Sequence, residues 1–556
     1  MNPIMKHALL PLLAAASCLT AAEPLRQASE ARLWLQVSND QPPLKDIHAS
    51  TGSVGTAHWE KDPLARQRFS DISFPIRWWK WTEIIIRFTP VENGTAQLTL
   101  SGPWAADANQ TMFRQEILWD QITATGTTIQ NGGFEETEEN HPAGWTSSWA
   151  PYLAEDAWPL KNAKAAQGKR VGASWHNRPL VQSIPLTAGK EVSIRLVARA
   201  ATLPDFVPPK TFPANSHAHR ECALLKRGVN FGNGWEAPPD QSWGIRFTPD
   251  DVDHAADEGF DHLRIPVAWH HYLTRGENGW NISPKLLAEL DPVLKRATER
   301  QLRVLLDWHH FDGLTKDPDA HLSRFIEGWE AIARHYQSAS PLIFFELLNE
   351  PCDLLTTEAL GPVYQKAIRA IRSISPSRII VASPGQWGQV GELDRLNLPD
   401  DDRIIVTVHC YEPFQFTHQG AGWVGLQALK GIQYPGPPAT PFQLPESLGD
   451  NSSVAAFVSA YNTLPTDINP CSRHPIRRTM KEAREWSDHF GRPVHLGEFG
   501  AHQTGDDASR ARYLKDVRNV CEELRIPWTM WEWKAGFGYW DPQAGKPRFR
   551  QALFDR

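Results

Sequence analysis

From residue 223 to its end, the chain alternates short apolar runs with amphipathic helical patterns. Helical stripes of period 3.6 stand at 322–336, 358–374, 475–490 and 508–524. The apolar runs are expected to be buried strands, and they are 225–231, 262–267, 303–308, 343–348, 379–383, 404–409, 493–496 and 527–531. Eight alternations predict an α/β fold of the (β/α)8 barrel type. A doubly wound open sheet is the alternative, but it gathers ligand groups at one switch point, whereas polar and aromatic residues here follow nearly every expected strand.

Two of the expected strands end in a glutamate. The run at 343–348 is followed by Asn349 and Glu350, and then by Pro351, which cannot continue a ladder. Glu498 ends the later run in the same way. Two carboxylates on the ends of separate core strands form the constellation of glycoside hydrolysis, in which one donates a proton and the other attacks or activates water. Each glutamate alone is as easily a loop residue or a helix cap, so the neighbouring residues decide.

Polar and aromatic residues at the other strand ends extend this candidate site. Arg264 lies among apolar residues and needs an anionic partner, which it would keep ionised. His309 and His310 point to opposite faces of a strand, so sugar contacts suit them better than metal chelation. The other candidates are interpreted as sugar-contacting or supporting residues: Asn233, Glu236, Asn349, Trp387, His409, Tyr411, His418, Trp423 and Trp531. Each is also explicable as a turn or core residue, and their recurrence at strand ends favours a sugar cleft.

Residues 23–205 carry the short β-rich runs of an all-β sandwich. The clearest strands are expected at 82–89, 95–100, 115–120, 181–186 and 191–197. The motif Asn-Gly-Gly-Phe-Glu at 131–135, followed by Gly144 and Trp145, resembles the opening of jelly-roll carbohydrate-binding modules. One permuted jelly roll is expected, with two smaller β units as the alternative, and a purely structural sandwich competes with a sugar binder. The proline-rich stretch 206–222 is the expected linker to a barrel domain at 223–556.

The amino terminus predicts export from the cytoplasm. An apolar run at 8–19 follows Lys6, and small residues at 20–22 complete a secretory signal peptide of residues 1–22. The run is too short to span a membrane, so the protein is expected to be secreted or periplasmic, with lipid attachment at Cys18 as the alternative. A net charge of -7 without a basic block argues against nucleic-acid binding. Cleavage would leave five cysteines, an odd number that predicts no disulfide framework, and no spacing suggests a zinc site.

The residues at the strand ends together resemble glycoside hydrolase family 5, the cellulase family. The matching motifs are Arg264, His309-His310, Asn349-Glu350-Pro351, His409-Cys-Tyr411, Gly497-Glu498-Phe499 and Trp531. The stretches 229–238, 416–420 and 531–538 are also similar to a bacterial endoglucanase branch, some of whose members cut mannan. The resemblance covers residues 223–556 and leaves out residues 23–222. The segment 424–471 looks longer than the usual loop of that branch.

This resemblance implies retaining hydrolysis that needs no metal or cofactor. Glu350 would be the acid/base and Glu498 the nucleophile, with their carboxyl groups ~5 Å apart. Arg264 and Tyr411 would lower the pKa of Glu498 and hold it ionised. Asn349 would bind the 2-hydroxyl of the attacked sugar. Trp531 would carry that sugar's ring.

The expected function is therefore an endo-acting β-1,4-glucanase with a polysaccharide or oligosaccharide substrate. A β-mannanase, or a hydrolase of xyloglucan, mixed-linkage glucan or β-1,3-glucan, is the alternative within the same class. A polysaccharide-binding protein without turnover is the alternative outside it, and the presence of both Glu350 and Glu498 argues against it.

Overall fold

The computed structural model describes residues 30–37, 44–49, 53–54, 67–102, 115–138, 141–146, 152–153, 165–201, 211–238, 241, 243–277 and 279–555. The chain forms two compact units that divide between residues 208 and 209. The expected signal peptide at 1–22, with Cys18, lies outside the described residues, as does the expected linker up to residue 210.

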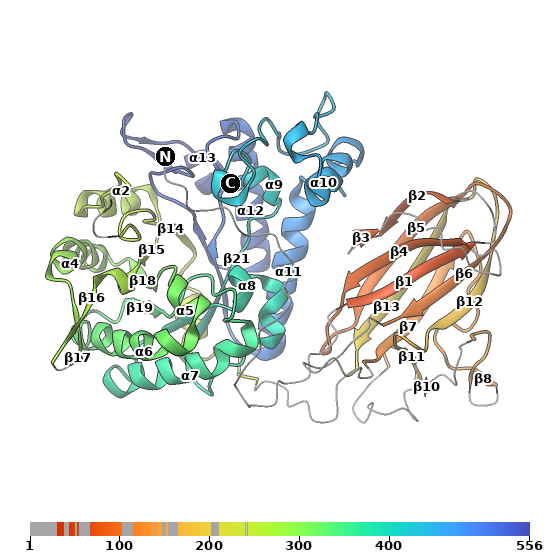
Figure 1. The fold of residues 1–556 in the computed structure, drawn as a ribbon, viewed down its shortest axis with the longest axis horizontal. Coiled ribbons are helices and arrows are strands. Elements are labelled where there is room, and N and C mark those ends of the chain that lie inside the picture. The colour runs from red at the N-terminus through yellow and green to blue at the C-terminus, as the bar shows by residue number, and fades with distance from the viewer. Residues whose placement is uncertain are drawn as a thin grey trace. The chain divides into compact units, whose positions relative to one another are not determined.

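The carboxyl-terminal unit is a closed barrel of eight parallel strands, which confirms the predicted fold and excludes the open sheet. The strands follow one another around the barrel in chain order: β14 (Arg227–Asn230), β15 (His262–Val267), β18 (Arg303–Trp308), β19 (Ile343–Glu346), β20 (Ile380–Ala382), β21 (Ile404–His409), β22 (Val494–Glu498) and β23 (Trp528–Met530). Helices surround the strands (Figure 1): α2 (Pro249–Glu258), α4 (Pro284–Glu299), α6 (Pro318–His335), α7 (Thr357–Ile374), α11 (Arg473–Phe490) and α12 (Asp507–Leu524).

Local sequence explains where these elements begin and end. Every residue of β15 and β21 is buried, which is why their sequences are nearly continuous apolar runs. Helix α2 starts at Pro249 behind a capping box in which Thr248 and Asp251 satisfy each other's backbone N–H groups. It stops at Gly259, whose φ of 101° lies in the left-handed region that glycine adopts without strain.

Smaller elements decorate the barrel. They are α1 (His217–Cys222), α3 (Trp269–Tyr272), α5 (Asp312–Lys316), α8 (Gly385–Gly388), α9 (Phe414–Thr417), α10 (Ser452–Thr463), α13 (Arg550–Phe554), the 3-10 turns η1 (Val390–Arg395), η2 (Gly422–Val424) and η3 (Glu446–Leu448), and the hairpins β16 (Leu273–Gly276) with β17 (Gly279–Ile282) and β24 (Trp540–Asp541) with β25 (Lys546–Pro547). Helix α1 lies within the expected linker. Its Ala218 and Cys222 are buried with Leu225 and Leu305 in a core cluster of the barrel, so this part of the linker belongs to the barrel unit.

The segment 424–471 is held against the barrel by buried polar contacts. Both the side-chain oxygen and nitrogen of Gln419 bond to the backbone of Ile432. Tyr434 is fully buried, and its hydroxyl donates to Asp516 on α12 at 2.8 Å. Tyr461 of α10 donates to the carbonyl of Gln433 at 3.0 Å. The segment is therefore an ordered addition to the barrel.

The amino-terminal unit is the predicted β-sandwich. One sheet has the order β12-β6-β1-β4-β3 and the other β10-β11-β7-β13-β5-β2. Their bounds are β1 (Glu30–Val37), β2 (Leu44–Ala49), β3 (Ser53–Val54), β4 (Gln67–Pro75), β5 (Thr82–Pro90), β6 (Gly94–Ser101), β7 (Ile117–Thr125), β10 (Tyr152–Leu153), β11 (Gly172–Ser174), β12 (Leu180–Leu186) and β13 (Val192–Ala200), with a small pair β8 (Thr137–Glu138) and β9 (His141–Pro142). Leu98 of the first sheet and Ile194 of the second share one core cluster, so the unit is one sandwich.

The cysteines and the helix lengths are two further properties of the fold. Cys222, Cys352, Cys410, Cys471 and Cys521 are free thiols. Among the residues that the structure describes, no helix is both long and apolar enough to cross a membrane.

Candidate active site

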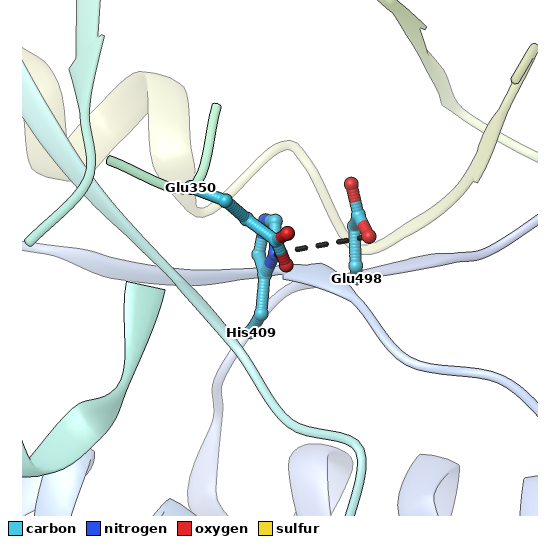
Figure 2. A group of neighbouring side chains, drawn as sticks. All are labelled: Glu350, His409 and Glu498. Carbon is cyan, nitrogen blue, oxygen red and sulfur yellow. Dashed lines mark hydrogen bonds and ion pairs between the residues drawn. The ribbon is translucent and has the colours of Figure 1, made fainter. Parts of the chain in front are cut away.

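Two glutamates stand at the carboxyl edge of the barrel. Strand β19 ends at Glu346, and four residues later Glu350 has a φ of 46°, a left-handed conformation that costs a non-glycine residue some strain. Glu498 is the last residue of β22. An oxygen of each carboxyl group and a ring nitrogen of His409 lie within 4.8 Å of one another, and Figure 2 shows these three side chains converging. The two carboxyl groups therefore share one small space.

Arg264 of β15 connects the groups beneath these carboxyls. Its guanidinium is fully buried and donates to both oxygens of Glu346, at 2.9 and 2.7 Å. It also donates to Glu498 at 2.7 Å, to Asn230 at 2.9 Å and to Asn349 at 2.7 Å. A buried arginine is stable only when its charge is paired and its donors are used. Because its N–H groups are used in this way, Arg264 holds one oxygen of Glu498 and the amide oxygen of Asn349 in place.

Glu498 is held in a buried but polar setting. It is 4% exposed, and its second oxygen accepts a hydrogen bond from the Tyr411 hydroxyl at 2.8 Å. Burial raises the pKa of Glu498, while His409, Arg264 and Tyr411 oppose that rise. The expectation that its pKa lies below the ordinary value is thus wrong, because the loss of hydration outweighs these contacts. Glu350 also has its pKa raised by burial but has no hydrogen bond from the arginine, so Glu498 is the member of the pair that ionises first.

His409 of β21 lies between the two carboxyl groups. Its Nδ1 is 2.7 Å from an oxygen of Glu350 and 3.7 Å from an oxygen of Glu498. Burial lowers the pKa of His409 and raises that of Glu350, so both shifts favour placing a shared proton on the carboxyl group. The contacts thus favour the proton on Glu350 and the charge on Glu498, which Arg264 and Tyr411 stabilise by hydrogen bonds.

Trp531 follows β23 and is fixed from two sides. The ring of His309 stacks parallel to it, with centroids 5.6 Å apart and an interplanar angle of 4°. Nδ1 of His309 lies 2.7 Å from Asp307, which sets the ring orientation. On the loop after β14, a Cβ atom at Gly232 would lie only 2.6 Å from the indole, so glycine allows this close approach. The backbone N–H of Trp531 donates to the carbonyl of Phe499, the residue after Glu498. The indole is thus a preformed flat surface at the edge of the barrel where Glu498 stands.

The other predicted residues surround this centre. The ring of His418 contacts the ring of Tyr411 edge-on, with centroids 4.9 Å apart. The ring of Trp423 lies on His418 with centroids 6.4 Å apart, and Trp423 is 53% exposed. His310 is exposed and contacts the Asn349 amide at 3.4 Å.

Trp387 is 50% exposed, and its backbone N–H donates to the carbonyl of Pro351, the residue after Glu350. Both Gln386 and Trp387 have positive φ, 52° and 59°, which costs strain and is typical of functional positions. Trp387 therefore stands beside the Glu350 turn with an uncovered ring face.

Asn233 and Glu236 contact each other on the loop after β14. The backbone N–H of Asn233 donates to Glu236 at 2.5 Å. The second oxygen of Glu236 is buried and has no hydrogen-bond partner among the described residues. Burial raises the pKa of Glu236 to about 8, so it is a neutral, incompletely bonded carboxyl group.

The site is supported by buried residues that were not predicted from the sequence. Glu346, Asn230 and Asp307 contact Arg264 from inside the barrel, and burial raises the pKa of Asp307 to about 7. Glu532 accepts from the backbone N–H groups of residues 534, 535 and 537 and orders the turn after Trp531. The signal for Glu346 was present, because it is the one charged residue in an apolar strand and Arg264 required an anionic partner.

Comparison with known proteins identifies the family. The model of the cellulase family, glycosyl hydrolase family 5, matches residues 226–536, which is more than half of the chain. The chain belongs to this family. The match lies within the barrel unit and contains both glutamates and every predicted site residue.

Curated relatives and solved structures agree with this assignment. The chain is 29% identical over 352 residues to Endoglucanase 3 of Fibrobacter succinogenes, a match that covers 60% of this chain but 53% of that protein. It is 27% identical over 326 residues to Endoglucanase C of Acetivibrio thermocellus, covering 56% of this chain and 91% of that one. The solved endoglucanase Cel5A of Thermotoga maritima is 30% identical with a TM-score of 0.52, covering 60% of this chain and 99% of the other. The same enzyme was also solved with mannotriose, at 29% identity, TM-score 0.51 and the same coverage. The chain thus spans about half the length of Endoglucanase 3.

Proposed function

We propose that this protein is a secreted, retaining glycoside hydrolase that cleaves β-1,4-glucan internally. The observation that carries the proposal is the approach of the Glu350 and Glu498 carboxyl groups, which have oxygens within 4.8 Å of each other. Retaining glycosidases place their two carboxyl groups about 5–5.5 Å apart, whereas inverting enzymes leave about 6.5–9.5 Å for a water molecule. The family's cellulase description and its endoglucanase relatives support the substrate class.

In the first step, Glu498 attacks the anomeric carbon and Glu350 acts as the acid. An oxygen of Glu498 forms a bond to that carbon as the bond to the leaving glycosidic oxygen breaks. Glu350 gives its proton to the leaving oxygen, so the departing sugar carries a hydroxyl group. Arg264 and Tyr411 hold the attacking carboxylate in position and keep it ionised, which limits the reorganisation needed for attack.

In the second step, the same two residues exchange tasks. Glu350 is now a carboxylate and takes a proton from water, and the resulting hydroxide attacks the anomeric carbon. The bond between sugar and Glu498 breaks, which restores both glutamates and the original anomeric configuration. His409, 2.7 Å from Glu350, supplies a polar contact in both protonation states.

The remaining residues would hold the sugar chain. Trp531 offers a flat face for the ring of the attacked sugar, and Asn349, fixed by Arg264, would bond the 2-hydroxyl. Asn233, Glu236, His309 and His310 would bind hydroxyl groups. Trp387 and Trp423 present exposed ring faces to sugars on either side of the cleavage point.

A β-mannan is the second candidate substrate. Its support is the solved structure of a Thermotoga maritima relative in complex with mannotriose. Secretion is supported by the amino-terminal sequence at 1–22. A binding protein without turnover is disfavoured because the site contains both Glu350 and Glu498, with carboxyl oxygens within 4.8 Å of each other.

The test is reducing-sugar release from a panel of purified glucans and mannans, measured for the wild type and for Glu498→Gln. We expect the wild type to cleave carboxymethylcellulose and β-1,4-glucan oligomers, and the variant to be inactive on all of them. Faster cleavage of mannan would replace glucan by mannan as the main substrate. Binding without turnover on every polymer would overturn the proposed enzyme function.

A further inference from the structure

We infer that the pair of glutamates and His409 form a binding site for a transition-metal dication of the zinc type, and that occupation of this site inhibits the enzyme. The expected inhibition rests on the proposed function, because it is measured as a loss of hydrolysis. Metal binding does not rest on that function and can be measured by itself. Among the described residues, Glu350, His409 and Glu498 are the one group of three acidic or imidazole side chains whose ligand atoms gather closely enough, within 4.8 Å, to hold a metal ion.

The three ligand atoms face one small space and must move before they can surround a tetrahedral ion. Zinc bonds nitrogen and carboxylate oxygen at about 2.0–2.2 Å, which places neighbouring ligand atoms about 3.3–3.5 Å apart. Nδ1 of His409 is 2.7 Å from Glu350 and 3.7 Å from Glu498. The first distance must open by about 0.7 Å and the second must close by about 0.3 Å, and the two carboxyl oxygens, which lie within 4.8 Å of each other, must close by up to about 1.4 Å. These movements would come from rotation of the two glutamate side chains, whose carboxyl groups converge beside His409 in Figure 2.

The surrounding charge favours a dication. Arg264 is the cation in contact with Glu498, but it also lies 2.7 Å from Glu346 and 3.1 Å from Asp307. Its single positive charge is therefore shared among three carboxyl groups, and Glu350 adds a fourth nearby. A dication between Glu350 and Glu498 would balance this excess of acid groups in a site of low hydration.

The ligand types select the metal. One imidazole nitrogen with two carboxylates suits zinc and its neighbours in the transition series. Calcium prefers six to eight oxygen ligands, and magnesium retains most of its water, so neither fits a three-ligand site of this kind. A bound zinc ion would occupy the acid and the nucleophile together and would lie where the anomeric carbon must be placed. Inhibition is therefore expected to be competitive with the substrate.

Calorimetric titration of Zn²⁺ into the chelator-treated full-length protein tests binding. We expect one site per chain, with at least tenfold weaker binding in His409→Asn. Glu498→Gln should weaken binding similarly, and it decides the question if His409→Asn does not fold. The matched control is His335→Asn, which removes the partly exposed His335–Asp291 pair and should leave the site unchanged.

Kinetics on a soluble oligosaccharide complete the test. Zn²⁺ should raise KM several-fold at constant kcat, a chelator should reverse the effect, and Mg²⁺ or Ca²⁺ at the same concentration should have none. Equal Zn²⁺ affinity in the wild type, His409→Asn and Glu498→Gln would overturn the inference, as would a fall in kcat at constant KM. If no glycan is hydrolysed, the proposed function fails, and the calorimetric comparison still decides whether the metal site exists.

Discussion

Tyr411→Phe removes one hydroxyl group and tests how Glu498 is kept ionised. The hydroxyl donates to a buried carboxylate at 2.8 Å, and hydrogen bonds to charged groups contribute about 1.5–3 kcal/mol. One pKa unit corresponds to about 1.4 kcal/mol. Loss of the donor disfavours the charged form, so the pKa of Glu498 should rise by about 1 to 2 pH units. The contact with Arg264 at 2.7 Å remains, so the nucleophile should still ionise.

The assay is the pH dependence of kcat/KM on an aryl cellobioside. Because Glu498 must be ionised to attack, the acidic limb of the profile should move to higher pH by about 1 to 2 units in Tyr411→Phe. Tyr434→Phe is the matched control, since it loses a hydrogen bond of the same length to Asp516 outside the site. An acidic limb that stays in place in Tyr411→Phe, or that moves equally in Tyr434→Phe, would show that the Tyr411 hydroxyl does not keep Glu498 ionised.

Three other variants probe the site. Glu498→Ala should lose turnover by roughly 10⁴-fold. Added azide should partly restore turnover and yield a glycosyl azide of inverted anomeric configuration. If Glu350→Ala gave the inverted azide instead, the roles of the two glutamates would be reversed. Glu350→Gln, assayed on an aryl glycoside whose leaving group needs no proton, should keep glycosylation and lose the alkaline limb, and persistence of that limb would mean that Glu350 is not the acid. Glu236→Gln should stabilise the protein at high pH. The pKa of Glu236 rises from 4.5 to about 8 on folding, so the stability that its neutral form contributes is complete below about pH 4.5 and is lost as pH rises to about 8. At most about 5 kcal/mol is involved, and a melting temperature of Glu236→Gln that tracks the wild type between pH 4 and 9 would contradict this.

The barrel strands could be predicted because burial on both faces leaves a simple signal. Runs such as 262–267 and 404–409 match β15 and β21 residue for residue. In the sandwich, by contrast, β1 and β4 were missed. The apolar residues of β4 at 69, 72 and 74 do not alternate cleanly, whereas those of β1 at 31, 33, 35 and 37 do and could have been recognised. Helix α1 was hidden in the linker because six residues carry too little periodicity to be recognised.

The positions of the site residues followed from strand ends, whereas their energetics did not. Sequence places Glu350 and Glu498 at the same edge of the barrel, but the raised pKa of Glu498 depends on how completely the fold removes water from it. Asp307 could not be assigned from a pattern, since only the closed barrel directs it toward Arg264. Glu346 stood out as the one charged residue of an apolar run, and the barrel shows that it is a partner of Arg264.

Aromatic residues were the least predictable from sequence. Trp145 looks available for sugar binding beside its glycine, yet it is 4% exposed and packs on Phe134 with ring centroids 5.3 Å apart. Its indole N–H donates to the carbonyl groups of residues 130 and 131 at 3.2 Å. Trp149, four residues further along the chain, lies outside the described residues. Exposure of a tryptophan is set by which loop covers it, and that information is not local.

The most direct test of the account is to trap the glycosyl-enzyme. Incubation with an activated 2-deoxy-2-fluoro cellobioside slows both steps of a retaining glycosidase but slows the second more, so the intermediate accumulates. Mass spectrometry of the digested protein should find one fluorocellobiosyl group per chain, attached to the peptide that contains Glu498. A label on Glu350, or rapid hydrolysis to a product of inverted configuration without any label, would contradict the assignment of Glu498 as the nucleophile.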